Sequence, residues 1–252
     1  MKFVAIIPAR YASTRFPAKP LALLGGKPII QHVYERVAQV FPTLCVATDD
    51  ERISSVVESF GGVAVITSPN HKSGTDRCYE AFCKMSTAAD VVVNVQGDEP
   101  FIDASQLHSI MHCFDDERTE IATLVKPFTY DATIEQIENP NSPKVVVNNN
   151  SEALYFSRSV IPYLRGVDKK EWPKRHNYLK HIGLYAYRTD VLQRITAMPQ
   201  GTLEKAESLE QLRWLEAGLC IKVGTTDIET IGIDTPDDLK RAEAFLKQQK
   251  SL

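Results

Sequence analysis

The chain has 252 residues, a formal net charge of -3 and an ordinary composition, with 43% hydrophobic and 24% charged residues. It is long enough to bury one large core or two modest ones, and it contains no apolar run of about 18 residues that could span a bilayer. The small net charge gives no global field for nucleic acid, and the N-terminus lacks a signal-peptide pattern. We therefore expect a cytoplasmic protein that binds neither nucleic acid nor a membrane.

Cysteine and histidine patterns indicate neither a disulfide framework nor a zinc site. The cysteines are odd in number and form no CxxC pair, which favours reduced thiols that we expect in the core. His108 and His112 lie at helical i, i+4 spacing, but the glutamate and the third ligand of a zinc helix are missing. The five cysteines are at positions 45, 78, 83, 113 and 220.

The first predicted element is a buried strand over residues 3–7, and a basic loop over residues 8–20 follows it. Three prolines in this loop exclude a continuous helix. The loop carries Arg10, Arg15 and Lys19 and no carboxylate. Cations at the C-terminal end of a strand lie where open α/β sheets bind ligands, so the loop predicts an anion site. The alternative is a solvated surface loop.

Strands and helices then alternate up to residue 66. Apolar residues at helical spacing predict a helix that starts at Pro28 and a second one capped by the segment 48–50. Two helical crossovers between three short apolar runs predict right-handed connections and a parallel sheet. The expected helices cover residues 28–41 and 51–60, and the expected strands cover 3–7, 44–47 and 63–66.

A polar loop over residues 67–74 precedes the next helix, which we expect Thr75 or Asp76 to cap. Val91–Val95 is the most continuous apolar run and is typical of a central strand buried on both faces. It ends in a Gln-Gly-Asp turn that brings Asp98 to the sheet edge that carries the basic loop. Asp98 is therefore a candidate metal ligand, and the alternative is an aspartate that only forms the turn.

The regular alternation changes after residue 125. Residues 126–180 contain several prolines and asparagines around two strand-like runs, and we interpret them as a lobe inserted into a single domain of residues 1–252. The expected elements of this half are helices at about 104–114 and 203–217 and strands at 120–125, 144–147, 153–156, 181–187 and 220–223.

The last predicted element is a C-terminal helix with Thr235 as its cap, Pro236 in the first turn and Asp238 as the second member of the capping pair. This pattern leaves the carboxylate of Asp234 without an assigned role. The alternative for Asp234 is an acid that the helix dipole stabilises.

Familiar motifs for phosphate binding and covalent catalysis are missing. Gly26-Lys27 is followed by proline instead of Ser or Thr, and neither GxGxxG nor GxSxG occurs. This excludes a P-loop, a dinucleotide fingerprint and a nucleophile elbow. A triphosphate would then be held by Arg and Lys side chains and loop amides, with magnesium balancing the remaining charge.

Seven short motifs occur in one order along nearly the whole chain. They are PARYASTR from Pro8 with KP at 19–20, SGTDR from Ser73, NVQGDEP from Asn94, YFSR from Tyr155, HIGLY from His181, ESLEQLR from Glu207 and DTP from Asp234. Each is modest alone, but together they closely resemble the 3-deoxy-manno-octulosonate cytidylyltransferase family, the CMP-Kdo synthetases of Gram-negative bacteria.

The resemblance implies a Rossmann-like nucleotidyltransferase fold, with a mostly parallel sheet flanked by helices and an inserted lobe for dimerisation and sugar binding. It implies transfer of CMP from CTP to the anomeric hydroxyl of 3-deoxy-manno-octulosonate (Kdo) with Mg2+, for lipopolysaccharide synthesis, by a homodimer. By matching motif, Pro8, Ala9, Arg10, Arg15, Lys19, Ser73, Gly74 and Gln96 would bind the nucleotide, Asp98 and Asp234 the metal, and Arg158, His181, Tyr185, Glu210 and Gln211 the sugar. Arg10, Lys19, Asp98 and Asp234 are the expected catalytic residues.

Two other functions stay open on the sequence alone. A cytidylyltransferase for another acid sugar, such as sialic acid, would share the cationic loop, but the segment 181–211 reads like the Kdo enzymes. A non-catalytic nucleotide-binding regulator would not need both Asp98 and Asp234, since binding alone requires no pair of metal ligands. A redox enzyme on the same fold class is disfavoured by the missing dinucleotide fingerprint.

Overall fold

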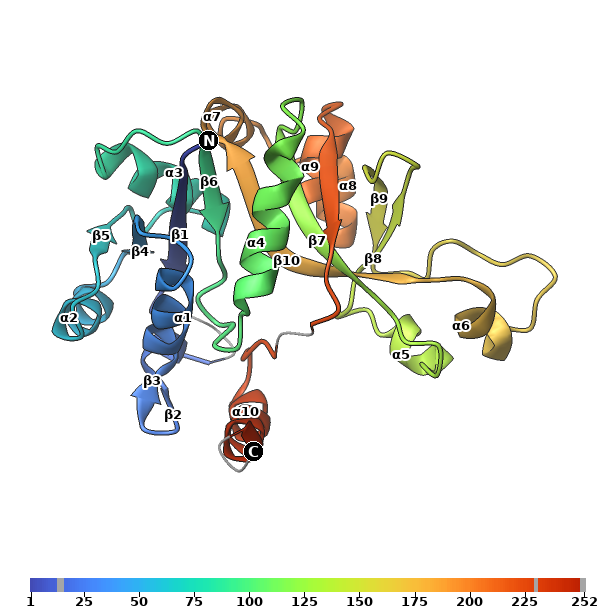
Figure 1. Cartoon of the computed structure of the whole chain (residues 1–252), viewed down its shortest axis with the longest axis horizontal. Coiled ribbons are helices and arrows are strands. Elements are labelled where there is room, and N and C mark those ends of the chain that lie inside the picture. The colour runs from blue at the N-terminus through green and yellow to red at the C-terminus, as the bar shows by residue number, and fades with distance from the viewer. Residues whose placement is uncertain (13–15, 229–230, 250–252) are drawn as a thin grey trace. The chain divides into compact units, whose positions relative to one another are not determined.

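We analysed a computed structural model, which describes residues 1–12, 16–228 and 231–249. The chain divides into two compact units, of which unit 1 comprises Met1–Leu107 with Thr230–Leu252 and unit 2 comprises His108–Glu229. Each unit combines strands and helices, as the α/β prediction requires (Figure 1). Among the helices described, none has the length and apolar character needed to cross a membrane.

Unit 1 is built on parallel strands in the order β6, β1, β4, β5 (Figure 1). β1 (Phe3–Ala9) lies between β4 (Leu44–Thr48) and β6 (Val91–Asn94), and β5 (Ala64–Ile66) follows β4. Every residue of β4 and β6 is buried, which is typical of strands covered on both faces. The predicted parallel sheet is confirmed, and it places the ends of β1 and β6 side by side.

Helices α1 (Ile29–Ala38), α2 (Glu51–Ser59) and α3 (Gly74–Lys84) follow β1, β4 and β5 and pack on this sheet. Asp50 caps α2 as predicted, since its side chain accepts from the Arg52 amide at 2.9 Å. The predicted cap of α3 is wrong. Ser73, with extended backbone, accepts from the Asp76 amide at 3.1 Å, so the helix already includes Thr75 and Asp76.

A hairpin and the C-terminal helix share an apolar cluster in unit 1. β2 (Leu23–Leu24) and β3 (Lys27–Pro28) are joined by Gly25 and Gly26, whose φ values of 58° and 86° suit glycine in such a turn. α10 (Pro236–Gln249) begins with the predicted capping pair, since the Thr235 amide donates to Asp238 at 2.8 Å. The cluster comprises Leu24, Ile29, Phe101, Ile233 and Ala242, with Phe16, Ala22, Ile231, Leu239, Phe245 and Leu246 around it.

Unit 2 contains a mixed sheet. β7 (Ile121–Pro127) pairs antiparallel with β10 (Leu179–Arg188) and parallel with β11 (Ile221–Thr225). The hairpin of β8 (Lys144–Val147) and β9 (Ala153–Ser157) joins through β8 to β10. The strands predicted in this half are all present, each within a few residues of its expected bounds.

The stretch predicted as a lobe has an apolar cluster of its own. It carries α5 (Ile134–Glu138), the 3-10 turn Lys169–Glu171 and α6 (Trp172–Arg175). Every member of the cluster falls within residues 126–180, as expected of a separately packed lobe, although its status as an insertion stays a prediction. The cluster comprises Ile134, Ile137, Trp172 and Tyr178, with Phe128, Val160, Leu164 and Val167 packed against it.

The predicted single helix at 203–217 is wrong, because α8 (Thr202–Glu207) and α9 (Gln211–Glu216) are separate. The helix is interrupted at Ser208, which has a left-handed backbone conformation with a φ of 51°. Across the break, the Arg213 guanidinium donates to both carboxylate oxygens of the buried Glu204, each at 2.7 Å. A buried bidentate pair of this kind fixes the angle between two short helices, which periodicity alone does not reveal.

Further elements complete the described chain. The predicted helix at 104–114 is α4 (Ala104–His112) with a 3-10 turn at Cys113–Asp115, and α7 (Thr189–Thr196) was not predicted. All five cysteines are free thiols, as expected. Their predicted core location is correct for Cys45, Cys78 and Cys113 but wrong for Cys83 and Cys220, which are exposed.

Replacing Arg213 with methionine should destabilise the fold by about 3–5 kcal/mol, because it leaves the Glu204 carboxylate buried without its partner. Urea unfolding of the variant and the wild type measures the difference. The matched control is Lys240→Met, which removes an exposed ion pair with Asp237 and should change stability by at most about 1 kcal/mol. Equal losses in the two variants would contradict this role of the buried pair.

Candidate active site

A cavity of about 410 Å³ opens in unit 1 where β1 and β6 end. Its position at the C-terminal ends of parallel strands is the usual place for ligands in open α/β sheets. The wall combines strand ends, a loop before α3 and the segment before α10. The lining residues are Pro8, Ala9, Arg10, Lys19, Pro20, His71, Lys72, Ser73, Gly74, Arg77, Gln96, Gly97, Asp98 and Asp234.

Gly97 allows the ends of β1 and β6 to approach each other closely. A Cβ atom at this position would lie 2.8 Å from the Pro8 carbonyl oxygen, which is closer than real Cβ contacts allow. Glycine is therefore required between Gln96 and Asp98 for the chain to turn against β1. This turn places the Asp98 side chain at the cavity.

The described parts of the basic loop are joined by a hydrogen bond, and Tyr11 in this loop also contacts an arginine of α2. The Ala18 amide donates to the Tyr11 carbonyl at 3.0 Å, and a 3-10 turn over Lys19–Leu21 follows. The Arg52 guanidinium lies over the Tyr11 ring, 3.4 Å from its centroid. Arg10 is exposed at the cavity, whereas the predicted triphosphate residue Arg15 lies outside the described residues.

Lys19 joins the two carboxylates that the sequence singled out. Its Nζ lies 2.5 Å from Asp98 Oδ2 and 3.0 Å from Asp234 Oδ1. Burial alone would lower the pKa of Lys19, but its contacts with Asp98 and Asp234 outweigh burial and raise the pKa above its usual value. One protonated ammonium group therefore sits between two carboxylates that come from positions 136 residues apart in the sequence.

Backbone contacts place Asp234 next to Lys19 and Asp98. The Ile233 amide donates to the Asp98 carbonyl at 2.9 Å, so the two segments run side by side. Ile233 is fully buried in the apolar cluster beneath the hairpin, and Thr235 and Asp238 start α10 directly afterwards. The capping pair thus fixes the backbone while the Asp234 side chain stays half exposed at the cavity.

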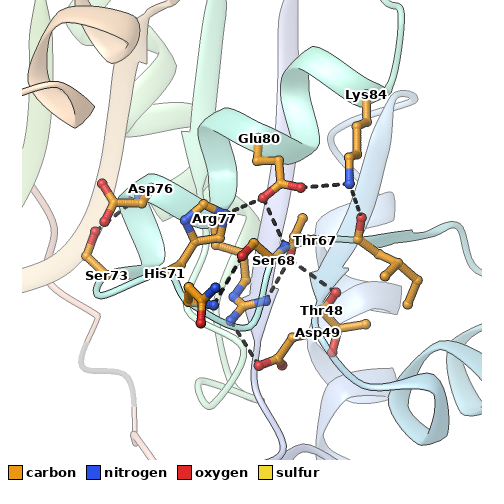
Figure 2. Close-up of polar contacts among 12 residues, drawn as sticks. Thr48, Asp49, Thr67, Ser68, His71, Ser73, Asp76, Arg77, Glu80 and Lys84 are labelled. Atoms are coloured by element: carbon orange, nitrogen blue, oxygen red, sulfur yellow. Dashed lines mark hydrogen bonds and ion pairs between the residues drawn. The ribbon is translucent and has the colours of Figure 1, made fainter.

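The loop before α3 forms another wall and is anchored by Arg77 (Figure 2). This arginine is buried, donates to Thr67 Oγ1 at 2.6 Å and lies 3.3 Å from Asp49 Oδ2. The Thr67 amide donates to the Thr48 carbonyl at 2.7 Å, which ties the start of the loop to the end of β4. Ser73, as the cap of α3, fixes the other end of the loop at the cavity.

The residues predicted to face the sugar all belong to unit 2. The Arg158 guanidinium donates to the carbonyls of Glu207 at 2.6 Å, Pro140 at 2.7 Å and Ser208 at 3.2 Å. The bonds to Glu207 and Ser208 satisfy backbone groups at the C-terminal end of α8, and the bond to Pro140 ties this end to the segment before β8. Within its unit Arg158 therefore holds the chain where α8 ends, and its predicted role toward a sugar stays a prediction.

His181 and Tyr185 lie on β10, on either side of a register shift in its pairing with β7. Thr123 Oγ1 donates within this irregular stretch to the carbonyls of Ile182 at 3.1 Å and Leu184 at 2.9 Å. Because the hydroxyl has one proton, it accepts from His181 Nε2, 3.0 Å away. Burial lowers the pKa of His181 to about 3, so the ring is neutral near pH 7.

Gln211 and Glu210 stand at the start of α9. Within the described part of the chain, Gln211 Nε2 is a buried atom without a hydrogen-bond partner, and the Tyr185 hydroxyl is buried with the Thr123 side chain near it. Glu210 Oε1 lies 3.8 Å from the Arg213 guanidinium. Buried polar atoms without partners are costly, which makes them candidates for contacts with a polar ligand or with water.

Comparison with known proteins identifies the family. The profile of a family described as "Cytidylyltransferase" matches residues 4–231. A 3-deoxy-manno-octulosonate cytidylyltransferase of Phocaeicola vulgatus is 66% identical over 250 residues, covering 99% of each chain. This chain belongs to the 3-deoxy-manno-octulosonate cytidylyltransferase family. Because it belongs to this family, the protein is a nucleotidyltransferase enzyme.

Solved structures agree with this family assignment. A structure of CMP:2-keto-3-deoxy-manno-octonic acid synthetase in complex with CTP matches with a TM-score of 0.90 and 43% identity, covering 99% of this chain and 100% of that chain. The 4-diphosphocytidyl-2C-methyl-D-erythritol synthase of Anaerococcus prevotii matches with a TM-score of 0.61 and 12% identity, covering 98% of this chain and 99% of that chain. The second likeness shows the nucleotidyltransferase fold alone.

Some cavity residues of this family member were not assigned from the sequence. His71, Lys72, Arg77 and Gly97 line the cavity together with the predicted residues. Arg77 and Gly97 stand inside motifs that carried the resemblance, so the motifs themselves were the available signal. His71 and Lys72 belong to a polar loop that the sequence located without assigning it a function.

The neutral His181 predicts a specific dependence of stability on pH. The pKa of this histidine is about 3 in the folded chain and about 6.5 when unfolded, so between these values only the unfolded chain binds the proton. The contribution of this group to the free energy of unfolding is complete above pH 6.5. It is lost as the pH falls from about 6.5 toward about 3. At pH 5 we expect the wild type to have lost about 2 kcal/mol through this group, and His181→Gln should not show that loss.

Urea unfolding of both proteins at pH 7 and pH 5 measures this difference. The comparison uses the change between the two pH values within each protein, so any constant effect of the substitution cancels. The same pH dependence in the wild type and in His181→Gln would contradict a neutral His181 with a lowered pKa.

Proposed function

We propose that this chain transfers CMP from CTP to the anomeric hydroxyl of Kdo, releasing pyrophosphate and giving CMP-Kdo for lipopolysaccharide synthesis. The observation that carries the proposal is the cavity at the ends of β1 and β6, where Arg10 and Lys19 meet Asp98 and Asp234. A related chain of 43% identity binds CTP. Cations and carboxylates together suit a phosphate ligand that arrives with a metal ion.

The triphosphate would lie against the basic loop and the start of α3. Arg10 is exposed at the cavity, and Ser73 and Gly74 form the N-terminal end of an eleven-residue helix. The free amides and the dipole at such a helix end attract anions. The cytidine would occupy the neighbouring wall with Gln96, next to Pro8 and Ala9.

Mg2+ fits the pair Asp98 and Asp234. Lys19 already places one positive charge between these carboxylates, so the pair is arranged for a cation. In the described part of the chain no group of three or more His, Cys, Asp or Glu side chains could hold a metal alone. Two carboxylates suit Mg2+, which usually takes its other ligands from phosphates and water. When bound, Mg2+ would supply charge neutralisation for the reacting phosphate.

The chain's own residues position the reactants and stabilise charge. In the metal-free chain Asp98 and Asp234 raise the pKa of Lys19, so its ammonium group meets the nucleotide in the protonated form and can donate to a phosphate oxygen. Arg10 adds a second fixed cation. In phosphoryl-type transfer such positioning and charge stabilisation supply most of the catalysis, so no dedicated protein base is required.

The sugar would be recognised by residues of unit 2. Tyr185 and Gln211 offer buried polar atoms, and His181 offers a neutral ring whose Nε2 proton is directed to Thr123. Neutral polar groups suit the hydroxyls of a sugar. Arg158 and Glu210 complete the predicted set. We further propose that the enzyme acts in the cytoplasm as a homodimer through its lobe.

Incubation with CTP, Kdo and Mg2+ tests the proposal, with pyrophosphate release as the readout. We expect release with Kdo and much less with sialic acid. Release with sialic acid but not with Kdo would assign a different sugar. Binding of CTP without product formation for any acid sugar would favour a nucleotide-binding regulator.

Asp98→Asn should keep the fold and lower turnover about a hundred- to thousandfold, because it removes one charge from the proposed metal pair. The matched control is Glu99→Gln, which changes the adjacent carboxylate that does not line the cavity. Steady-state rates with saturating substrates measure both variants. Normal turnover in Asp98→Asn would remove Asp98 from the metal site.

A further inference from the structure

Glu80 is a carboxylate outside the cavity that holds the loop forming one cavity wall. It lies on α3, two turns after the helix start, and its side chain points back to residues 67–73 (Figure 2). The cavity lining includes His71, Lys72 and Ser73 from this loop but not Glu80 itself. Glu80 can therefore affect a ligand only indirectly, and the cavity residue that its side chain contacts, His71, belongs to the loop.

Three donors converge on the Glu80 carboxylate. Oε2 accepts from the Ser68 amide at 2.9 Å and from His71 Nε2 in a short contact, and Oε1 accepts from Lys84 Nζ at 2.7 Å. Two of these donors, Ser68 and His71, belong to the loop, one near its start and the other near its tip. One side chain thus fixes two points of the loop to the helix that follows it.

The Glu80 carboxylate is ionised at neutral pH. Burial alone would raise its pKa, but the bonds from Lys84, the Ser68 amide and His71 outweigh burial and lower the pKa to about 2. The contacts to the loop are therefore charge-assisted, and such bonds are stronger than those between neutral groups. Lys84 also donates to the Ile66 carbonyl at 2.8 Å, on the solvent side of the cluster.

The two ends of the loop are anchored independently of Glu80. Arg77 and the Thr48 carbonyl hold Thr67, and Ser73 caps α3. Removing Glu80 should therefore leave the loop ends in place and release its middle, where His71 faces the cavity. A released loop samples more conformations, and a ligand that needs one of them binds more weakly because it must order the loop.

We propose that Glu80 is a positioning residue for CTP, holding His71 and the loop 67–73 in the conformation that binds the nucleotide. This inference rests on the proposed function, in which the cavity of unit 1 binds CTP. It assigns to Glu80 an effect on nucleotide affinity and not on the chemical step, because Glu80 acts through the wall and does not line the cavity.

Titration calorimetry with CTP and Mg2+ tests the inference, with steady-state kinetics alongside. Glu80→Ala should weaken CTP binding about tenfold, the usual scale for losing charge-assisted bonds, while kcat and the KM for Kdo stay near wild type. Glu80→Gln keeps an acceptor for the Ser68 amide and should recover part of the affinity. Lys84→Met is the matched control, because it removes the exposed partner and should change CTP affinity less than about twofold.

A double-mutant cycle separates this role from a general structural one. If Glu80 acts through His71, the loss in His71→Ala combined with Glu80→Ala should be clearly smaller than the sum of the two single losses. Additive losses, or wild-type CTP affinity in both Glu80 variants, would overturn the inference. So would a fall in kcat and in the affinities for both substrates that follows a fall in Tm. Absence of CTP binding by the wild type would instead reject the proposed function.

Discussion

Two carboxylates that share one ammonium group organise the candidate active site. Lys19 comes from the loop after β1, Asp98 from the turn after β6, and Asp234 from the segment before α10. Two carboxylates that contact the same ammonium group repel each other, and the positive charge of Lys19 offsets part of that repulsion. In the proposed function, the same pair of carboxylates would hold Mg2+.

The scaffold brings these three groups together by backbone constraints and not by side-chain contacts alone. Gly97 lets the end of β6 pass close to Pro8, and the Ile233 amide binds the Asp98 carbonyl. Burial of Ile233 in the cluster under the hairpin makes this approach favourable. Sites supported in this way are held more accurately than sites on free loops, which suits a reaction that depends on positioning.

Much of the fold could be predicted because its signals are local. The buried run at β6 and the caps of α2 and α10 follow from neighbouring residues. The break between α8 and α9 could not be predicted in the same way, because the Glu204–Arg213 pair that fixes it depends on tertiary burial. The cap of α3 was misassigned because Ser73, Thr75 and Asp76 can all cap a helix, and only the backbone conformation selects one.

Part of the candidate site could also be predicted from the sequence. Basic residues at a strand end and an aspartate after a buried strand indicated a phosphate and metal site from the residues alone. Asp234 needed the family motif, since its approach to Asp98 is a contact between distant segments. The sequence did not indicate a role for Glu80, because a glutamate on a helix is usually a solvated surface residue. Its role depends on contacts with Ser68, His71 and Lys84 that only the structure shows.

The most direct test of the shared carboxylate pair is the dependence of CTP affinity on Mg2+, measured by titration calorimetry. We predict that Mg2+ tightens CTP binding to the wild type, and that Asp234→Asn loses this gain while it keeps the affinity measured without metal. Equal CTP affinity with and without Mg2+, or a gain that survives in Asp234→Asn, would contradict a metal site formed by Asp98 and Asp234.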